Sequence, residues 1–372
     1  MKQTTDGAEK LRDTYAIKKG APVYMKEFGY YCLERWIAEG YIHCEEDLKG
    51  YCGFDEPGLF TLGNLGGCEA PFEPVFETEI LEDRGHYELV RDYAGRHVLY
   101  FKGRRDGFMP EYIDHPVKDW KTWESACKWR MDPHTPKRLE KIKQTIGEAL
   151  PAVEKGLMLS QYIVGGYMYL RSMIGPVELL YKFYDDPGLI HDCMKAWFDV
   201  ADFVTAQYQQ YVTLDEILFD EDICYNHGIL ISPDMVNEFL LPYYQQLMTN
   251  IKKRQPDKSR HLFLQLATDG YCVPVIPIYE KMGMDVMCPF EAASNNNVAE
   301  IGRQYPNLVI SGGMDKRILA TDKDAIDRMV DGIMPVMKER GGYIPTCDHG
   351  VPAEVSFENY IHFRKRLLEY AL

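Results

Sequence analysis

The sequence predicts an α/β fold of the TIM-barrel type, a (β/α)8 barrel with an N-terminal extension and a small antiparallel ribbon. In the second half of the chain, short apolar runs end in polar or glycine-rich turns and helical patterns follow them. Six such runs begin 23 to 58 residues apart, which leaves room for a crossover helix between each pair. Strands joined by helices run parallel. A length of 372 residues suits one large barrel with additions.

The individual elements follow from local signals. Helix starts are indicated by Thr321 with Asp324, by Ser232 before a proline and by Ser356, and Pro242 should kink or restart its helix. The predicted barrel strands are residues 158–163, 216–220, 261–266, 285–290, 308–310 and 343–346, and the predicted ribbon strands are 77–81, 88–91 and 96–101.

We therefore expect a single domain over residues 1–372. Residues 1–150 should hold the extension, the ribbon and the first barrel strands, and residues 151–372 the regular strand-helix repeats. The ribbon is expected to cover part of the barrel mouth, and the sequence leaves open whether it acts as a lid or as a subunit contact.

Composition excludes several classes of function. The formal net charge is −15, without a basic patch, which argues against binding to nucleic acid or to anionic membrane surfaces. Ten cysteines are spread singly, which argues against a disulfide framework, and no run reaches the roughly 18 apolar residues of a membrane span. With no apolar signal region in residues 1–6, a cytoplasmic location is expected.

Acidic residues and one histidine follow the predicted strands, at the end of a barrel where active sites lie. Converging carboxylates repel one another unless a proton or a cation intervenes, so the cluster favours a metal site or an acid of raised pKa. Each residue alone could equally be a helix cap or an ion-pair partner. The turn residues are Asp220, Glu221, Asp222, Asp269, Glu291, Asp315, Lys316, Asp348 and His349.

A second candidate is the turn Gly165-Gly166, followed by Tyr167 and Arg171. Two glycines let a ligand approach the backbone near an aromatic ring and a cation. A tight turn that buries its tyrosine is the competing interpretation.

Several of these segments together resemble the uroporphyrinogen decarboxylase superfamily, and more narrowly its cobamide-dependent methyltransferases. The resemblance extends from about Ala21 to the C-terminal helix and implies a TIM barrel. It rests on residues 28–40, 175–187, 231–233, 268–270, 311–316 and 348–360.

The resemblance offers two enzymatic functions. The decarboxylases grip their polycarboxylate substrate with an arginine-bearing segment near the start, whereas residues 24–29 of this chain contain no arginine. Decarboxylation of uroporphyrinogen is therefore the alternative, together with a non-catalytic barrel that binds a corrinoid or porphyrinoid. The favoured function is the first methyltransferase of a corrinoid-dependent O-demethylase, which moves methyl from an ether, expected to be an aryl methyl ether, to Co(I) on a corrinoid partner protein.

The resemblance also implies a metal site. Thiol-methylating relatives bind zinc at positions that match Ala267, Asp269 and His349, and similar zinc methionine synthases place a glutamate ligand where Glu291 stands. We expect Asp269, Glu291 and His349 to hold a metal, with zinc favoured and Glu221 in reserve. Oxygen and nitrogen ligands leave a harder ion than thiolates do, suited to activating an ether oxygen.

The remaining site residues are assigned by position. Asp222 and Asp348 are the candidate catalytic acids. Tyr30, Tyr31, Tyr167 and Arg171 are expected to contact the methoxylated substrate. The corrinoid protein should dock at the same barrel mouth, with Lys316 at the docking surface, because cobalt must reach the methyl group directly.

Overall fold

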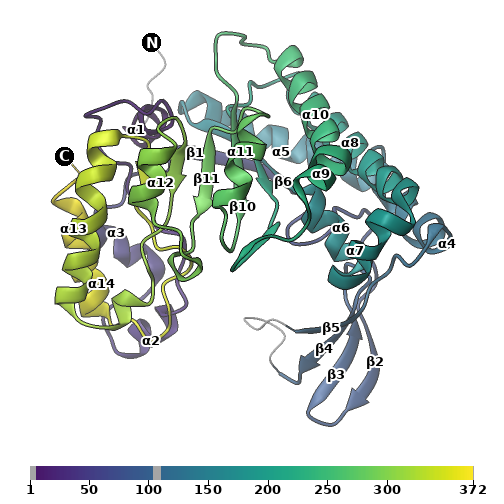
Figure 1. The fold of residues 1–372 in the computed structure, drawn as a ribbon, viewed down its shortest axis with the longest axis horizontal. Coiled ribbons are helices and arrows are strands. Elements are labelled where there is room, and N and C mark those ends of the chain that lie inside the picture. The colour runs from purple at the N-terminus through teal and green to yellow at the C-terminus, as the bar shows by residue number, and fades with distance from the viewer. Residues whose placement is uncertain (1–5, 104–109, 372) are drawn as a thin grey trace.

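A computed structural model describes residues 6–103 and 110–371 of the protein as a TIM-barrel-like α/β fold, which confirms the predicted fold class (Figure 1). Within these residues seven parallel strands form one sheet in the order β1-β6-β7-β10-β11-β12-β13. The strands are β1 (Leu59–Leu65), β6 (Met158–Val164), β7 (Glu216–Asp220), β10 (Phe263–Thr268), β11 (Val286–Pro289), β12 (Val309–Ser311) and β13 (Tyr343–Ile344).

Six of these strands were predicted, and their bounds differ from the expected ranges by two residues at most. The first strand, β1, had no predicted range because Gly63 and Asn64 are poor strand formers. Pairing with β6 holds it in place, in a register that joins Leu59 to Met158 and shifts once between Leu62 and Leu65.

An extended segment, residues 24–30, lies between the two edges of the sheet. The Asp55 amide, just before β1, donates to the Met25 carbonyl. At the other edge, Val351 after β13 donates to the Gly29 carbonyl and accepts from the Tyr31 amide. This segment therefore occupies the position between β13 and β1 where a barrel needs an eighth strand.

The amino ends of the strands are closed by α1 (Asp6–Tyr15). Its Leu11 and Tyr15 pack with inward-facing residues from the starts of the strands, including Met158, Val286 and Val309. A polar contact completes this floor: the Tyr15 hydroxyl donates to the buried Glu216 carboxylate at 2.5 Å. Access to the barrel is therefore confined to the opposite, carboxyl end of the strands.

Helices cover the outside of the sheet, with α8 and α10 on one side and α13 and α14 on the other (Figure 1). The helices after α1 are α2 (Leu33–Ala38), α3 (Lys49–Cys52), α4 (Trp120–Thr122), α5 (Pro136–Glu154), α6 (Gly166–Ile174), α7 (Pro176–Asp185), α8 (Pro187–Tyr208), α9 (Pro233–Met235), α10 (Leu241–Arg254), α11 (Ile276–Glu280), α12 (Val298–Gln304), α13 (Lys323–Arg340) and α14 (Phe357–Leu368).

Most predicted helix signals act as expected. Ser232 and Ser356 cap α9 and α14, and a π-helical turn before Leu241 lets the helix restart directly ahead of Pro242. The predicted Thr321 cap of α13 is wrong, because Asp322 accepts from the Ala325 amide instead. The Thr321 hydroxyl donates to the Ile318 carbonyl of the preceding turn, and the helix begins one residue later than predicted.

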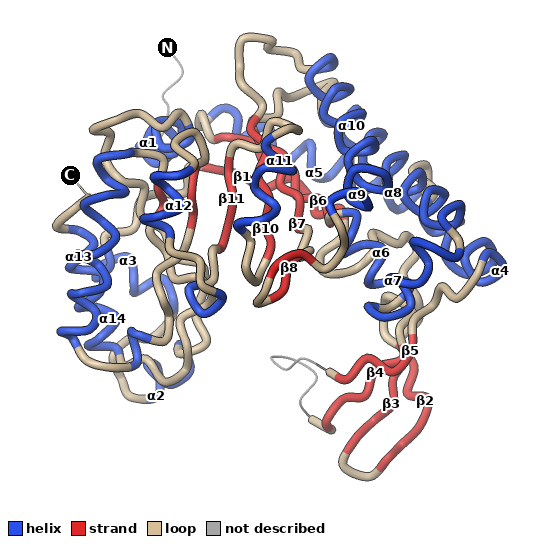
Figure 2. Tube along the Cα trace, in the orientation of Figure 1, coloured by secondary structure: helices blue, strands red, loops and turns tan. Residues whose placement is uncertain are grey.

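The predicted ribbon is present and has four antiparallel strands, β2 (Glu79–Arg84), β3 (Tyr87–Arg91), β4 (His97–Phe101) and β5 (Glu111–Asp114). Figure 2 shows it as a separate lobe of strands beside α7. Its base is tied to the barrel by Arg96, which pairs with Asp92 at 2.7 Å and with Glu69, a residue that follows β1, at 2.8 Å. Its role as lid or subunit contact stays a prediction.

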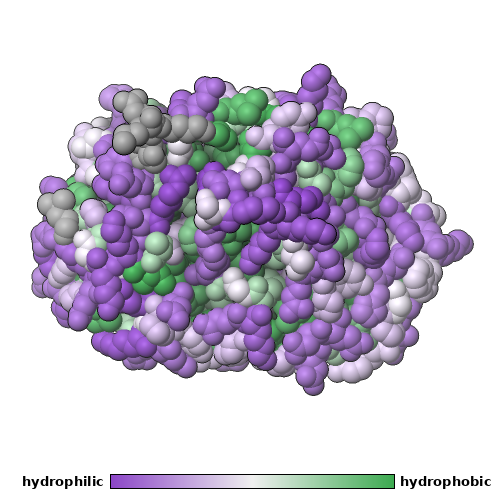
Figure 3. Space-filling view, turned by 90° about the horizontal axis from the view of Figure 1, so that it is seen from above, coloured by the Kyte–Doolittle hydropathy of each residue, from purple (hydrophilic) through white to green (hydrophobic). Residues whose placement is uncertain are grey.

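Two observations concern binding to membranes, which the composition argues against. No helix of the described residues has both the length and the apolar character needed to cross a membrane. Seen from above, on the side of α1, the surface is mostly hydrophilic with separate hydrophobic patches (Figure 3).

Candidate functional site

The barrel interior is open toward the carboxyl ends of its strands. Asp220, Ala267 and Cys288 occupy the last inward-facing positions of β7, β10 and β11. Tyr162 faces inward two residues before the end of β6, and all four residues are partly accessible to solvent. One layer deeper, inward-facing residues such as Val286 are fully buried. Solvent therefore reaches the upper half of the barrel and the turns around it.

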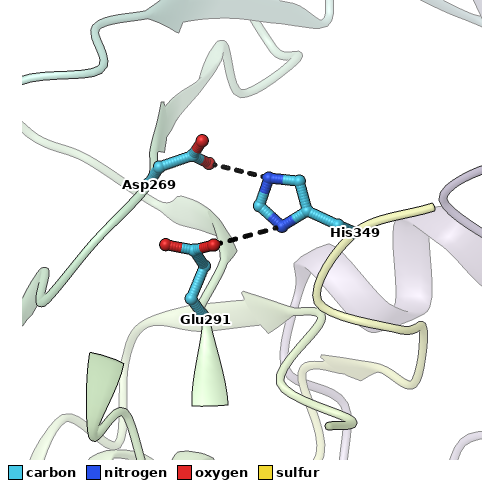
Figure 4. Close-up of side chains that lie close together, drawn as sticks. All are labelled: Asp269, Glu291 and His349. Atoms are coloured by element: carbon cyan, nitrogen blue, oxygen red, sulfur yellow. Dashed lines mark ion pairs between the residues drawn. The ribbon is translucent and has the colours of Figure 1, made fainter. Parts of the chain in front are cut away.

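Three residues of different turns meet at this end: Asp269 after β10, Glu291 after β11 and His349 after β13 (Figure 4). The His349 Nε2 atom lies 3.2 Å from the Asp269 Oδ1 atom. The His349 Nδ1 atom lies 3.6 Å from the Glu291 Oε1 atom. One imidazole is thus held between two carboxylates, each facing a different ring nitrogen.

The backbone around Glu291 explains its position. Its second oxygen accepts the Gly270 amide at 2.7 Å, which ties the β11 turn to the β10 turn beside Asp269. Phe290 has φ +57, a left-handed conformation that turns the chain sharply after the strand. On the next turn Gly312 has φ +106, and a Cβ there would lie 2.0 Å from the Pro289 carbonyl oxygen, so only glycine fits.

Charges around the three residues affect the pKa of His349. The hydrogen bond to Asp269 raises the pKa of His349, and partial burial and Lys316 oppose it. The Lys316 ammonium lies 4.0 Å from Glu291 and 3.8 Å from Asp348. The Lys316 side chain is 24% exposed and lies beside the three residues, and its place at a docking surface stays a prediction.

The donor set suits a divalent metal ion. One ligand atom from each of the three residues lies within 4.8 Å of the others. The His349 Nδ1 atom is buried without a hydrogen-bond partner and faces Glu291, so a metal bound there would satisfy it. Asp269 faces Nε2 and would have to turn toward the same ion to complete the set. Zinc accepts such nitrogen and oxygen ligands, and three protein ligands leave a position open for a substrate atom. We therefore regard the residues as fitting the expected ion.

The reserve ligand Glu221 lies apart from this group. Its side chain is completely buried, and it accepts the Tyr244 hydroxyl at 2.5 Å and the Tyr167 amide at 2.9 Å. Burial raises the pKa of Glu221 to about 7, despite these two hydrogen bonds. It anchors the start of α6 as a buried acid.

The two candidate catalytic acids have different surroundings. Asp222, at φ +39, pairs with Arg171 at 2.5 Å, so these two predicted site residues meet each other at the mouth. Asp348 is buried and accepts the amides of Ala292 at 2.9 Å and Lys316 at 3.4 Å. Asp348 therefore joins the turns that carry Glu291 and His349.

The predicted tyrosines are spread widely. Tyr30 donates a 2.9 Å hydrogen bond to the Tyr360 hydroxyl, whose own hydrogen goes to Glu27, and packs on Trp36. Tyr31 is 69% exposed, and Tyr167 is buried beneath Arg171. None of these three has a described contact with Asp269, Glu291 or His349.

Sequence reasoning missed two features of the site. Phe28 is 52% exposed, and its ring centre lies 5.3 Å from that of His349, so it supplies an aromatic wall. Tyr162 donates to Asp220 inside the barrel, and burial raises the pKa of Asp220 to about 6. The alternation of β6 could have indicated that Tyr162 faces inward, whereas nothing in the sequence placed Phe28 beside His349.

A family model and a curated relative indicate the same family. Residues 105–370 match the family model described as uroporphyrinogen decarboxylase (URO-D). A curated uroporphyrinogen decarboxylase from Legionella pneumophila (strain Corby) is 24% identical over 139 residues, 36% of each chain, so the match spans about a third of that relative. A methyltransferase from Methanosarcina mazei has a TM-score of 0.62 at 12% identity, with 100% of both chains covered, which indicates a shared fold.

Proposed function

Since the chain belongs to the uroporphyrinogen decarboxylase family, we propose that it is an enzyme that transfers a methyl group from an O-methyl substrate to the Co(I) corrinoid of a partner protein. The substrate class we favour is aryl methyl ethers. The fold shared with a methyltransferase supports this branch of the family.

One observation carries the proposal: two carboxylates and an imidazole meet at the open end of the barrel without a thiolate among them. Held by Asp269, Glu291 and His349, a zinc ion would supply Lewis acidity toward a substrate oxygen. Such an oxygen-and-nitrogen site suits an oxygen leaving group better than the soft sulfur of a thiol. Departure of a phenol, whose pKa is about 10, is easier than departure of a simple alkoxide.

The chain's own residues would position the substrate. Phe28 offers an exposed ring beside His349, against which an aromatic substrate can stack. Tyr162 and Asp220 provide polar groups within the barrel. The open barrel end would also be the docking place of the corrinoid protein, because cobalt must approach the methyl group opposite the departing oxygen.

Electrostatics disfavour the alternative, decarboxylation of uroporphyrinogen. Eight substrate carboxylates would meet an end of the barrel that itself carries several carboxylates, including Asp220, Asp269 and Glu291. Among the described residues here, Arg171 already pairs with Asp222, and Lys316 lies close to Glu291 and Asp348. The described part of the site therefore favours a neutral or weakly charged substrate.

The test is a spectroscopic assay with the purified, zinc-loaded protein. Reduced cobalamin is mixed with each member of a panel of methoxylated aromatic compounds, and formation of methylcobalamin is followed by its absorbance. Uroporphyrinogen is assayed in parallel for loss of carboxyl groups. The matched control is Asp269→Asn, which keeps the size of the side chain but weakens its binding to a metal.

The outcomes separate the functions. The proposal is supported if the wild type forms methylcobalamin and Asp269→Asn forms it at least about tenfold more slowly. Loss of carboxyl groups from uroporphyrinogen without methyl transfer makes the protein a decarboxylase. Tight corrinoid or porphyrin binding without either reaction makes it a binding barrel.

A further inference from the structure

A buried carboxylate, Glu27, lies in the extended segment that closes the barrel. Only 3% of its side chain is exposed, although a carboxylate is costly to bury. The Glu27 Oε1 atom accepts two backbone amides, that of Phe28 at 3.0 Å and that of Cys347 at 2.8 Å. Sequence reasoning assigned this residue no role.

Those two amides belong to the two sides of the candidate site. Phe28 is the aromatic wall, and Cys347 stands two residues before His349. One oxygen atom of Glu27 therefore joins the segment that carries the Phe28 ring to the turn that carries the His349 imidazole. The centres of the two rings lie 5.3 Å apart.

The other oxygen of Glu27 is held by the C-terminal helix α14. The Tyr360 hydroxyl donates to the Glu27 Oε2 atom at 3.0 Å, and the fully buried Arg364 guanidinium lies 3.7 Å away. Burial raises the pKa of Glu27, and Arg364 and the hydrogen bonds oppose that rise. The carboxylate is thus fixed from two directions and can act as a rigid bridge.

We propose that Glu27 is a positioning residue that sets the placement of His349 relative to Phe28, and through it the affinity of the site for a metal ion. The use of metal affinity as a measurement rests on the proposed function, because His349 is a metal ligand only in that proposal. The placement of the turn itself does not depend on a metal.

Four variants test this role by calorimetric titration of the protein with Zn²⁺ alone. Glu27→Gln keeps an oxygen that can accept both amides. Glu27→Asp keeps the charge but is one methylene shorter, so it cannot reach both amides and Tyr360 together. Glu27→Leu removes the acceptors. Glu216→Leu is the matched control, a buried carboxylate of the barrel floor that accepts the Tyr15 and Ser160 hydroxyls at 2.5 Å each.

A positioning role predicts that Glu27→Gln binds zinc within about threefold of the wild type, and that Glu27→Asp and Glu27→Leu bind at least about tenfold more weakly. Glu216→Leu should lose stability but stay within about threefold in zinc affinity. If Glu27→Asp binds zinc as tightly as Glu216→Leu does, the proposal is overturned. Glu27→Asp decides the question if Glu27→Leu does not fold.

Amide hydrogen exchange separates this proposal from the proposed function. If the wild type binds no zinc, the metal site fails, and exchange in the peptide around Cys347 then tests Glu27 without a metal. The positioning role is supported if this peptide exchanges at least about tenfold faster in Glu27→Asp than in the wild type, while its exchange in Glu216→Leu is unchanged. Equal exchange in Glu27→Asp and wild type refutes it.

Discussion

Replacement of Glu221 by glutamine should change how the stability of the protein depends on pH. Glu221 is completely buried and receives hydrogen bonds from Tyr244 and from the Tyr167 backbone. Burial raises its pKa from 4.5 to about 7. Folding therefore favours the protonated acid, and the stability that this contributes is fully present below about pH 4.5 and is lost as the pH rises through about 7.

The size of the effect follows from the two pKa values. A change of one pKa unit corresponds to about 1.4 kcal/mol, so the raised pKa of Glu221 corresponds to about 3 kcal/mol over the whole titration. Between pH 5 and pH 8 the wild type should lose about 2 to 3 kcal/mol of stability from this group. Glutamine stays neutral throughout, so Glu221→Gln should lack this loss.

The assay is urea denaturation of both proteins at pH 5, 6, 7 and 8. Relative to the wild type, Glu221→Gln should become more stable by about 2 to 3 kcal/mol as the pH rises from 5 to 8. Asp220 titrates in both proteins and largely cancels in this comparison. Glu140→Gln, which replaces an exposed carboxylate on α5, is the matched control. A constant difference between Glu221→Gln and the wild type would refute the assignment of Glu221 as a buried acid.

Three further predictions concern the candidate site. His349→Ala should bind zinc at least about tenfold more weakly than the wild type in a calorimetric titration. The control is His362→Ala, because His362 pairs with Asp327 between α14 and α13, and it should bind zinc as the wild type does. Equal zinc affinities of His349→Ala and the wild type would remove His349 from the ligand set. Lys316→Gln should bind zinc about threefold to tenfold more tightly, because an ammonium 4.0 Å from Glu291 repels a cation, and weaker binding would contradict this. Phe28→Leu should raise the KM for a methoxylated aromatic substrate with little change in Tm, because the ring is 52% exposed, and an unchanged KM would exclude stacking.

The sequence was informative about the fold where hydrophobic pattern and turn chemistry agree. The apolar run at 216–220 is bounded by polar residues, and β7 has the same bounds. The pattern failed for β1, where Gly63 and Asn64 lower strand propensity and only pairing with β6 holds the strand. It also failed between Thr321 and Asp322, because both side chains can cap a helix and the local pattern does not fix its start to within one residue.

The candidate site was partly predictable for a topological reason. Asp269, Glu291 and His349 come together because they follow parallel strands, whose carboxyl ends lie at one end of a barrel. Phe28 and Glu27 were not predictable in this way, because their segment is an irregular closure of the barrel rather than a patterned strand. Tyr30 and Tyr167 pack in the interior, as aromatic side chains commonly do.

The central claim is that the Asp269, Glu291 and His349 site supports movement of an ether methyl group to cobalt. The most direct measurement follows the methyl carbon itself, with an aryl ether labelled with ¹³C in its methoxy group, reduced cobalamin and the zinc-loaded protein. Mass spectrometry should find the label in methylcobalamin, with one phenol released per methyl transferred, and should find at least about tenfold less with His349→Ala. The claim would be contradicted if the wild type holds stoichiometric zinc and yet transfers no labelled methyl to cobalamin from any ether of the panel.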